Sequence, residues 1–273
     1  MAHRSHRKTA LILLALAIAA LAAACASTPT GRSQVMLVGD REMNAMGIQA
    51  FDQLKQETRV SSNSRHQRYV RCIADALIAE LPTEWRELPW EIQVFQDDSA
   101  NAFALPGGKV GVNTGMLQLA GSADQLAAVV GHELAHVMYR HGAERFSQQI
   151  LAQTGLTVAA VAANTQAPEN AQLIMGALGA GAQVGVLLPF SRKHETEADL
   201  EGQRLMARAG FDPAESVALW QRMQDQGGAR PPTFLSTHPN PGGRIQALQR
   251  ELATSRPLYQ QARAAGRAPT CRP

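Results

Sequence analysis

The sequence lacks a strong excess of charge, internal repeats and any signature of nucleic-acid binding. Its formal net charge is +3, and Arg4, Arg7 and Lys8 account for all of it, because residues 1–24 contain no acidic residue. The rest of the chain is therefore neutral (3 − 3 = 0), so charge offers no argument for nucleic acid as a partner. The sequence shows no internal repeat. Its apolar content suits a single domain with a substantial core.

Cysteine is also scarce, with three residues in the whole chain. Cys25 ends an apolar run and is expected to carry a lipid. This leaves Cys72 and Cys271 as one possible pair. Outside the cytoplasm such a pair can be oxidised. We expect a Cys72–Cys271 disulfide that ties a C-terminal tail, residues 256–273, to an early helix and restrains a very long loop. Two unpaired thiols are the alternative.

Residues 1–24 have the pattern of a secretion signal, with a basic start and a run of small apolar residues from position 9. The cysteine that ends this run predicts a lipoprotein, in which the chain is cleaved before Cys25 and attached to a membrane by acyl chains on Cys25. Residues 25–40 would then be a lipidated tether. A transmembrane anchor is the alternative, because the apolar run is nearly long enough to cross a bilayer.

The motif with the clearest chemistry is His132-Glu133-Leu134-Ala135-His136, an H-E-x-x-H sequence. Residues four apart lie on one face of a helix, so both imidazoles can reach a single metal ion. The glutamate beside the first histidine can take a proton from a metal-bound water. The alternative is a surface helix that carries these residues by chance.

The residues before the motif predict a helix that starts near Ser122. Ser122 and Gln125 have capping-box spacing, and the apolar residues that follow recur with a helical period. The motif is therefore expected on a buried or half-buried helix rather than in a loop. Gly131 costs that helix about 1 kcal/mol relative to alanine, and it either permits close packing or has no role.

A catalytic zinc site needs a third protein ligand, with water in the fourth position. The metzincin extension would place a glycine and a histidine at offsets that here hold Tyr139 and Gly142. His141 lies one position too early, and five residues from His136 is poor spacing for one helical face. We therefore expect His141 to be structural or exposed, and Tyr139 to have a packing role.

A glutamate from a later helix is the other route to a third ligand. Glu195 and Asp199 are four residues apart and share a helical face, while Glu197 points elsewhere. Glu195 could ligate the metal, and Asp199 could then hydrogen-bond the free ring nitrogen of a histidine ligand. A solvated acidic face on a surface helix is the alternative.

Taken together, four motifs in this chain resemble those of the HtpX-like gluzincin metallopeptidases, the family that also includes the CAAX prenyl proteases. The motifs are, in order, Asn101–Gly108, His132–His136, Glu195–Asp199, and His238-Pro239 followed by Arg244-Ile245. The resemblance covers roughly residues 40–252, and it is greatest to the soluble periplasmic lipoprotein members of the family.

The resemblance implies one Zn²⁺ per chain, bound by His132, His136 and Glu195, with Glu133 as the general base and Asp199 as a partner of a ligand. It implies a zincin-type metallopeptidase domain, which we place at residues 41–255, in an outer-membrane lipoprotein that faces the periplasm. The expected activity is endopeptidase cleavage of misfolded or unassembled envelope polypeptides. One alternative is an envelope-protein assembly chaperone with gated or minor proteolysis, and another is a structural lipoprotein whose zinc only stabilises the fold.

The periodicity of the sequence predicts a mainly α domain with a small antiparallel β-sheet, an α+β fold class. The expected helices cover 41–57, 66–81, a segment capped by Asp212, and 241–252, and the expected strands cover 91–95 and a hairpin of 101–105 with 109–113. Residues 154–188 are small and apolar but interrupted by polar residues, so neither half spans a membrane comfortably. They either cover the active site, rest on lipid or a partner, or form core helices.

The second strand of the hairpin is a candidate substrate site. Proteases of this type bind a peptide as an added strand along a sheet edge. The resemblance favours this role for Val110, Gly111, Val112 and Asn113. An ordinary buried strand is the alternative.

His238 lies in a proline-rich turn, residues 236–241. It can approach the metal from the open side of the site, where it would either stabilise the oxyanion or occupy the position of the water at rest. A surface histidine is the alternative. Arg244 is expected to pair with an acidic group or to bind substrate.

Overall fold

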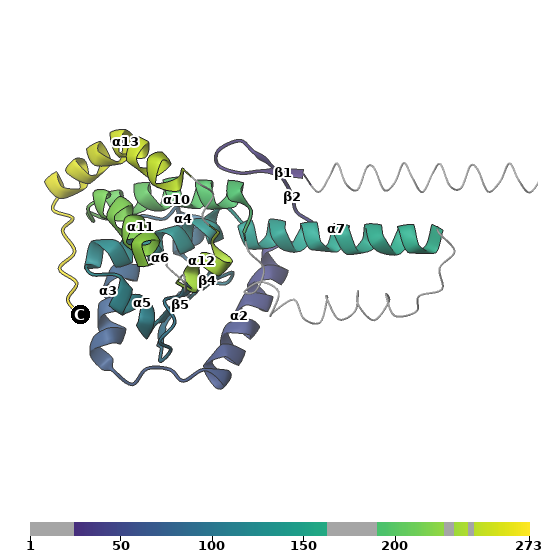
Figure 1. Cartoon of the computed structure of the whole chain (residues 1–273), viewed down its shortest axis with the longest axis horizontal. Helices are drawn as coiled ribbons and strands as arrows, with labels where there is room; N and C mark the ends of the chain where they lie inside the picture. The colour runs from purple at the N-terminus through teal and green to yellow at the C-terminus, as the bar shows by residue number, and fades with distance from the viewer. Residues whose placement is uncertain (1–24, 163–189, 227–231, 240–242) are drawn as a thin grey trace, which may run out of the picture.

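The computed structural model of the chain describes residues 25–162, 190–226, 232–239 and 243–273. These residues form a mainly helical domain with two small sheets, and helix α7 (His141–Ala162) extends away from the rest (Figure 1). The predicted fold class, mainly α with a small sheet, is confirmed. The predicted signal at 1–24 and residues 163–188 of the segment 154–188 lie outside the described residues. Residues 154–162 belong to α7, and their side chains are not described.

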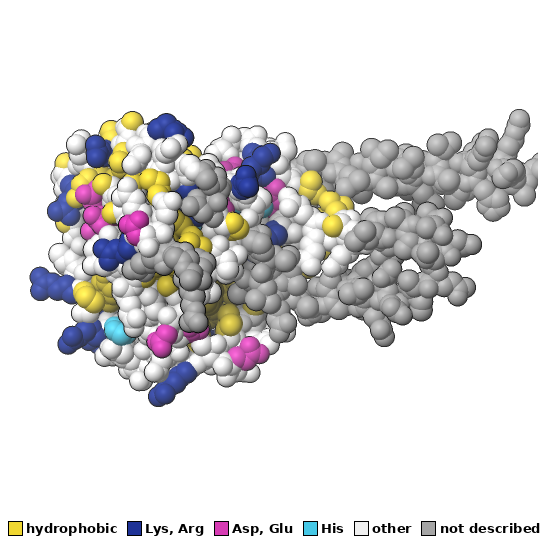
Figure 2. Space-filling view, in the orientation of Figure 1, with side chains coloured by type: hydrophobic (Ala, Val, Ile, Leu, Met, Phe, Trp, Pro, Cys, Tyr) yellow, Lys and Arg dark blue, Asp and Glu magenta, His cyan; other side chains and the backbone are white. Residues whose placement is uncertain are grey.

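In the described part of the chain, no helix combines the length and the apolar character that a membrane span requires. On the face seen in Figure 2, basic and acidic side chains are interspersed over the domain. The described residues of this face therefore do not gather into an extended patch of one sign.

The longer predicted helices are present. α2 (Asp40–Glu57), α3 (Ser64–Ile78) and α11 (Ala214–Gln226) occupy the expected positions. The side chains of Asn63 and Asp212 accept hydrogen bonds from the first backbone N–H groups of α3 and α11. The sequence pattern does not predict three short helices of four to six residues, which show no clear period. These are α4 (Thr83–Arg86), α5 (Thr114–Leu119) and α12 (Phe234–Thr237).

The larger sheet has three strands in the order β3 (Glu91–Phe95), β5 (Lys109–Asn113) and β4 (Ala102–Leu105). β4 and β5 form the predicted antiparallel hairpin, which turns at Gly107 and Gly108, both at positive φ (84° and 74°). β3 pairs with β5 in parallel, so the sheet is mixed rather than purely antiparallel.

The position of β5 corrects the predicted substrate strand. β5 is paired on both sides, by β3 and β4, and all five of its residues are buried. Val110, Gly111, Val112 and Asn113 therefore have no open edge to which a peptide could add, and the buried-strand alternative is correct. β3 and β4 are the two outer strands of this sheet. Residues 59–61 pair with the outer side of β3 at Val94 and Phe95, whereas no described strand pairs with the outer side of β4.

Helix α6 (Ala123–Met138) carries the H-E-x-x-H motif through the core. Ser122 caps it as predicted, because its side chain accepts a hydrogen bond from the backbone N–H of Gln125 at 3.1 Å. Every residue from Gln125 to Met138 is buried, which rules out a surface helix that carries the motif by chance.

Helix α10 (Arg192–Arg208), which carries Glu195, packs directly against α6 at two glycines. A Cβ atom on Gly131 would lie 3.0 Å from the carbonyl oxygen of Gly202, and a Cβ atom on Gly202 would lie 2.7 Å from the backbone nitrogen of His132. Glycine at both positions therefore lets the two helix backbones approach each other. This is the close-packing role that the sequence left open for Gly131.

The last helix is longer than predicted. α13 runs from Arg244 to Ala264 and passes through Pro257, whereas the sequence pattern predicts an end at residue 252. The helix continues because its far half packs on the domain, where the buried Ser255 donates a hydrogen bond to Gln203 of α10. The predicted boundary at residue 255 thus falls inside a helix, and residues 256–264 are not a separate tail.

Cys72 of α3 and Cys271 are joined by the predicted disulfide, across a sequence separation of 199 residues. The bond ties the end of the chain to α3, which contributes several residues to the main hydrophobic core. Cross-linking such distant residues restricts the unfolded chain and stabilises the fold.

The residues after Cys25 are folded, which contradicts the predicted tether over 25–40. β1 (Cys25–Ser27) and β2 (Ser33–Val35) form an antiparallel hairpin, and Thr28 and Gln34 are buried. The side chain of Arg32 reaches a glutamate on α7 and another on α10. Ion pairs to segments far away in the sequence thus order a stretch whose polar composition alone is typical of a linker.

Candidate metal centre

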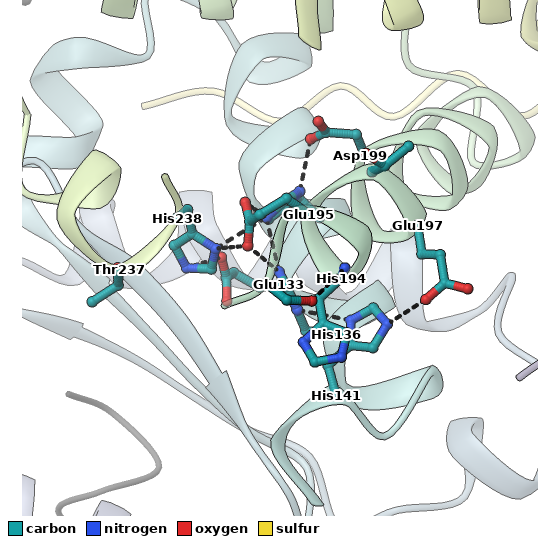
Figure 3. Close-up of polar contacts among 12 residues, drawn as sticks. Glu133, His136, His141, His194, Glu195, Glu197, Asp199, Thr237 and His238 are labelled. Atoms are coloured by element: carbon teal, nitrogen blue, oxygen red, sulfur yellow. Dashed lines mark hydrogen bonds and ion pairs between the residues drawn. The ribbon is translucent and has the colours of Figure 1, made fainter. Parts of the chain in front are cut away.

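Two helices and one turn bring four potential metal ligands together in the core. His132 and His136 come from α6, Glu195 comes from α10, and His238 directly follows α12. One donor atom from each residue lies within 4.8 Å of the others, and all four residues are buried. Figure 3 shows His136, Glu195 and His238 directed toward one another.

The distances between the donor atoms fit a tetrahedral zinc ion. Nε2 of His132 lies 3.0 Å from Nε2 of His136 and 3.2 Å from Nδ1 of His238. Oε1 of Glu195 lies 3.4 Å from Nε2 of His136 and 3.1 Å from Nδ1 of His238. Ligand atoms about 2.0–2.1 Å from zinc at tetrahedral angles would be about 3.3 Å apart. Imidazole and carboxylate donors also suit the chemistry of this ion.

The protonation states of the group favour a cation as well. Burial lowers the pKa of His132 and of His136 well below the usual range, so each imidazole is neutral and has a lone pair for a metal. Burial alone would raise the pKa of Glu195, but hydrogen bonds with His136 and His238 outweigh this effect and hold the pKa below its usual range. Neutral nitrogen donors are therefore combined with one carboxylate charge.

Glu133 lies beside this group, where a general base is needed. Its Oε2 accepts a hydrogen bond from the backbone N–H of Ala104 in β4 at 3.2 Å. Its Oε1 is buried and makes no hydrogen bond, although Nε2 of His238 lies 3.3 Å from it. Burial raises the pKa of Glu133 to about 7, a value that suits proton transfer near neutral pH.

Asp199 holds His132 from behind, as the spacing in the sequence predicts. Oδ1 of Asp199 lies 3.0 Å from Nδ1 of His132, so the proton of that ring stays on Nδ1 and the lone pair of Nε2 faces the ligand group. Arg244 pairs with Asp199 and also donates a hydrogen bond to Oε2 of Glu195 at 2.9 Å. Its guanidinium lies 3.4 Å from the centre of the Trp220 ring. Of the two roles expected for Arg244, the structure shows pairing with acidic groups.

His141 supports the other histidine ligand, a role that the sequence does not predict. Its Nδ1 lies 2.9 Å from Nδ1 of His136, and its Nε2 lies 3.1 Å from Oε2 of Glu197 (Figure 3). His141 is buried and is not part of the ligand group, so the expectation of a structural residue is correct. Helical spacing misses the contact because Arg140, at positive φ (54°), separates α6 from α7.

A pocket opens directly beside His136. Most of its lining is apolar and comes from separate parts of the fold, including Met43, Trp85, Ala104, Val137 and Phe190. Asp40 and Arg140 also line it and form an ion pair at 2.8 Å. The ligand group therefore adjoins a space that suits an apolar side chain.

The structure brings together the residues predicted for the metal and its base and leaves the predicted substrate strand elsewhere. The residues that meet are His132, Glu133, His136, Glu195, Asp199 and His238. Residues 110–113 lie in the middle of the sheet, and the Cys72–Cys271 disulfide ties the end of the chain to α3. A metal-binding group with a carboxylate base beside it is the arrangement that metal-assisted hydrolysis uses.

Known proteins resemble this chain over the same region. The mitochondrial metalloendopeptidase OMA1 of Schizosaccharomyces pombe is 39% identical over 165 residues, which are 60% of this chain and 47% of the relative. The metalloendopeptidase OMA1 of Danio rerio is 32% identical over 236 residues, 81% of this chain and 48% of the relative. The beta-barrel assembly-enhancing protease of Escherichia coli K12 is 32% identical over 178 residues, 63% of this chain and 36% of the relative.

The chain spans about half of the length of these relatives, or less. Residues 64–252 match peptidase family M48. This range contains every residue of the ligand group and the residues that support it. Since the match extends over more than half of the sequence, the chain belongs to peptidase family M48.

Proposed function

We propose that the chain is a zinc-dependent endopeptidase that cleaves unfolded polypeptides. The observation that carries this proposal is the meeting of His132, His136 and Glu195 from adjoining helices, with the carboxylate of Glu133 beside them. Two neutral imidazoles and one carboxylate are a ligand set of catalytic zinc sites, which keep a fourth position for water. Membership of peptidase family M48 supports peptide-bond hydrolysis as the reaction.

In this reaction Glu133 would carry the proton. When bound, zinc would supply a Lewis acid for the scissile carbonyl and lower the pKa of a water molecule. The buried Oε1 of Glu133, which makes no hydrogen bond, would accept the proton of the attacking water and then pass it to the leaving amine. A pKa of about 7, raised by burial, lets one carboxylate both accept and release a proton near neutrality.

The substrate backbone would bind along β4 as an added strand. β4 pairs with β5 on one side, and the backbone N–H of Ala104 points from its other side to Glu133, at 3.2 Å. An extended peptide on this edge would therefore pass directly by the base. Main-chain hydrogen bonds depend little on the side chains of the substrate, which suits unfolded substrates of varied composition.

The pocket beside His136 would receive a side chain of the bound peptide. Its lining by Met43, Trp85, Val137 and Phe190 favours an apolar side chain, which is typical of the segments that unfolded proteins expose. The preference can be measured with a peptide library that varies one position at a time on each side of the cleaved bond.

The position of His238 supports a gated activity. Its Nδ1 is the fourth donor of the ligand group, and its Nε2 lies 3.3 Å from Oε1 of Glu133. His238 thus occupies the space that a water would need between the metal and its base, and it would have to move before hydrolysis. This observation favours a second candidate function, an assembly chaperone for envelope proteins with gated or minor proteolysis. The name of the Escherichia coli relative, a beta-barrel assembly-enhancing protease, points in the same direction.

We further propose that the protein is an outer-membrane lipoprotein, lipidated on Cys25, that faces the periplasm and acts on misfolded or unassembled envelope polypeptides. The apolar run before Cys25 supports lipidation. The Cys72–Cys271 disulfide supports an oxidising compartment. Labelling with a fatty acid should mark the wild type and not a Cys25→Ser variant, and density fractionation of the membranes should place the labelled protein in the outer membrane.

The test of the proposed activity compares wild type with Glu133→Gln. Both proteins should bind one zinc ion, because Glu133 is not a ligand, and only the wild type should cleave casein. Uncleaved casein with fully zinc-loaded wild type would contradict the proposal. If assembly of envelope proteins continues undiminished in cells that contain only Glu133→Gln, the chaperone function is favoured.

A further inference from the structure

The hairpin formed by β1 and β2 is connected to the metal centre through a chain of hydrogen bonds. The chain starts at His136, whose Nε2 faces the other ligands, 3.0 Å from Nε2 of His132. If this nitrogen supplies its lone pair to a metal, the proton of the ring must be on Nδ1. That N–H then donates to Nδ1 of His141 at 2.9 Å, and the N–H on Nε2 of His141 donates to Glu197 at 3.1 Å. The orientation of the His136 ring therefore depends on where the Glu197 carboxylate lies.

The carboxylate of Glu197 is held from the hairpin. Its Oε1 accepts a hydrogen bond from the hydroxyl of Thr30 at 2.6 Å. Its Oε2 accepts hydrogen bonds from Nε and Nη2 of Arg32 at 3.1 and 2.9 Å. Hydrogen bonds between a guanidinium and a carboxylate are stronger than neutral ones and define the geometry more closely. Donors from the hairpin thus fix both oxygens of the acceptor on which His141 depends.

Arg32 itself is held in place by a second carboxylate and by the loop. Nη1 and Nη2 of Arg32 donate to the two oxygens of Glu144 in α7, at 2.6 and 2.7 Å. The loop is closed by a hydrogen bond from the backbone N–H of Thr28 to the carbonyl of Arg32 at 2.8 Å, and Thr28 is buried. The guanidinium therefore bridges α7 and α10 from a loop of defined shape.

We propose that Arg32 is a positioning residue of the metal centre, which orients the zinc ligand His136 through Glu197 and His141. The inference rests on the proposed zinc-dependent function and adds to it the segment that directly follows Cys25. Residues 28–32, which the sequence predicts to be a tether, would then support the metal site. Loss of the contact between Arg32 and Glu197 would then reach the metal without any contact between the hairpin and the substrate.

A simpler alternative is that Arg32 only fastens the hairpin to the domain. The two glutamates that it contacts separate these possibilities. Glu144 and Glu197 both pair with Arg32, but only Glu197 contacts His141. The described hydrogen bonds and ion pairs of the Glu144 side chain are with Arg32, Gln34, His194 and Gln148. The ring of His194 stacks on His141, but Glu144 makes no described hydrogen bond to His136 or His141. Loss of Glu144 leaves the hydrogen bonds from Arg32 and Thr30 to Glu197 in place, so His141 keeps its acceptor. Loss of Glu197 removes that acceptor and releases the histidine.

The experiment measures zinc affinity of the full chain by competition with a chelator, for the variants Glu197→Gln, Glu144→Gln and Arg32→Ala. Loss of a residue that orients a metal ligand typically lowers metal affinity by roughly 10- to 100-fold. We expect a loss in this range for Glu197→Gln and a smaller loss, at least about threefold, for Arg32→Ala. Glu144→Gln should stay within about twofold of wild type, as should Arg41→Ala, whose side chain is 94% exposed.

A second measurement does not depend on stability. After replacement of zinc by cobalt, the visible absorption spectrum reports the geometry of the ligands, and it should change in Arg32→Ala and Glu197→Gln but not in Glu144→Gln. If Arg32→Ala does not fold, Arg32→Lys replaces it, because lysine keeps the charge but lacks the planar fork that bridges two carboxylates. Unchanged affinity and spectrum in the Arg32 and Glu197 variants would overturn the inference, whether or not the wild type cleaves casein. A wild type that binds zinc and cleaves nothing would instead count against the proposed function.

Discussion

Gly202 of α10 lies so close to α6 that a Cβ atom at this position would come within 2.7 Å of the backbone nitrogen of His132. The contact sets the spacing between the helix that carries both histidine ligands and the helix that carries Glu195. The metal centre therefore depends on a residue with no side chain as well as on its ligands.

Gly202→Ala should weaken both the fold and the metal site. The added methyl must push α10 away from α6, and overpacking of this kind costs about 1–3 kcal/mol of stability. Alanine favours a helix by about 1 kcal/mol relative to glycine, so any net loss comes from the clash. Gly142→Ala is the matched control, because a Cβ atom there would meet nothing within 4 Å. Denaturant unfolding and zinc titration should show losses for Gly202→Ala only.

His238→Ala should increase casein cleavage at saturating zinc. The change removes the fourth donor of the ligand group and frees the space next to Oε1 of Glu133, so that a water can enter. Zinc affinity should fall at the same time, because one ligand is lost. A lower cleavage rate with zinc fully bound would contradict this account and would favour the other predicted role of His238, stabilisation of the oxyanion.

Arg244→Met should be among the most destabilising single changes. It leaves Asp199 and Glu195 without their cationic partner inside the core, and removal of one partner from a buried ion pair costs about 3–5 kcal/mol. Arg204→Met is the control, because Arg204 is half-exposed and pairs with Glu251 at 2.7 Å. A partly exposed pair of this kind contributes about 1 kcal/mol or less. Equal unfolding free energies for the two variants would refute the prediction.

The stability of the zinc-free protein should decrease in acid through Glu144. Burial alone would raise the pKa of Glu144, but hydrogen bonds from His194 and Arg32 outweigh it and lower the pKa to about 2. An unfolded glutamate has a pKa of about 4.3. A carboxyl group with a lower pKa in the folded state stabilises the fold above the unfolded value, and this contribution is lost as the pH falls through the folded value.

Ionised Glu144 should therefore make the wild type more stable than Glu144→Gln above the pKa of the unfolded glutamate. The contribution from Glu144 ionisation, on the order of 3 kcal/mol, should be complete above about pH 5 and should disappear between about pH 4.3 and pH 2. Urea unfolding of both proteins across this range, with a chelator present, measures it. Parallel curves for the two proteins would show that Glu144 does not contribute in this way.

Much of the metal centre could be predicted from local spacing. The helical period and the cap at Ser122 predicted a buried or half-buried helix for the H-E-x-x-H motif, and the helix is buried. The four-residue interval between Glu195 and Asp199 made these residues candidates for a ligand and its support, and the structure brings both to the histidines. These predictions succeeded because each depends on residues within one helix, where geometry follows directly from sequence separation.

The features that the sequence could not predict depend on contacts between distant segments. Strand order puts β5 between β3 and β4, and no local pattern distinguishes a central from an edge strand in so short a sheet. Arg32 meets Glu197 across 165 positions, so the segment after Cys25 resembles a tether until it is folded. The contact of His141 with His136 depends on the positive φ of Arg140, which interrupts the helical spacing.

The most direct test of the central claim is anomalous diffraction at the zinc edge from crystals of the zinc-loaded protein. The account predicts one zinc peak per chain, about 2.0–2.2 Å from Nε2 of His132, Nε2 of His136 and a carboxylate oxygen of Glu195. Zinc bound elsewhere, or bound by the two histidines while Glu195 lies out of reach, would contradict the account.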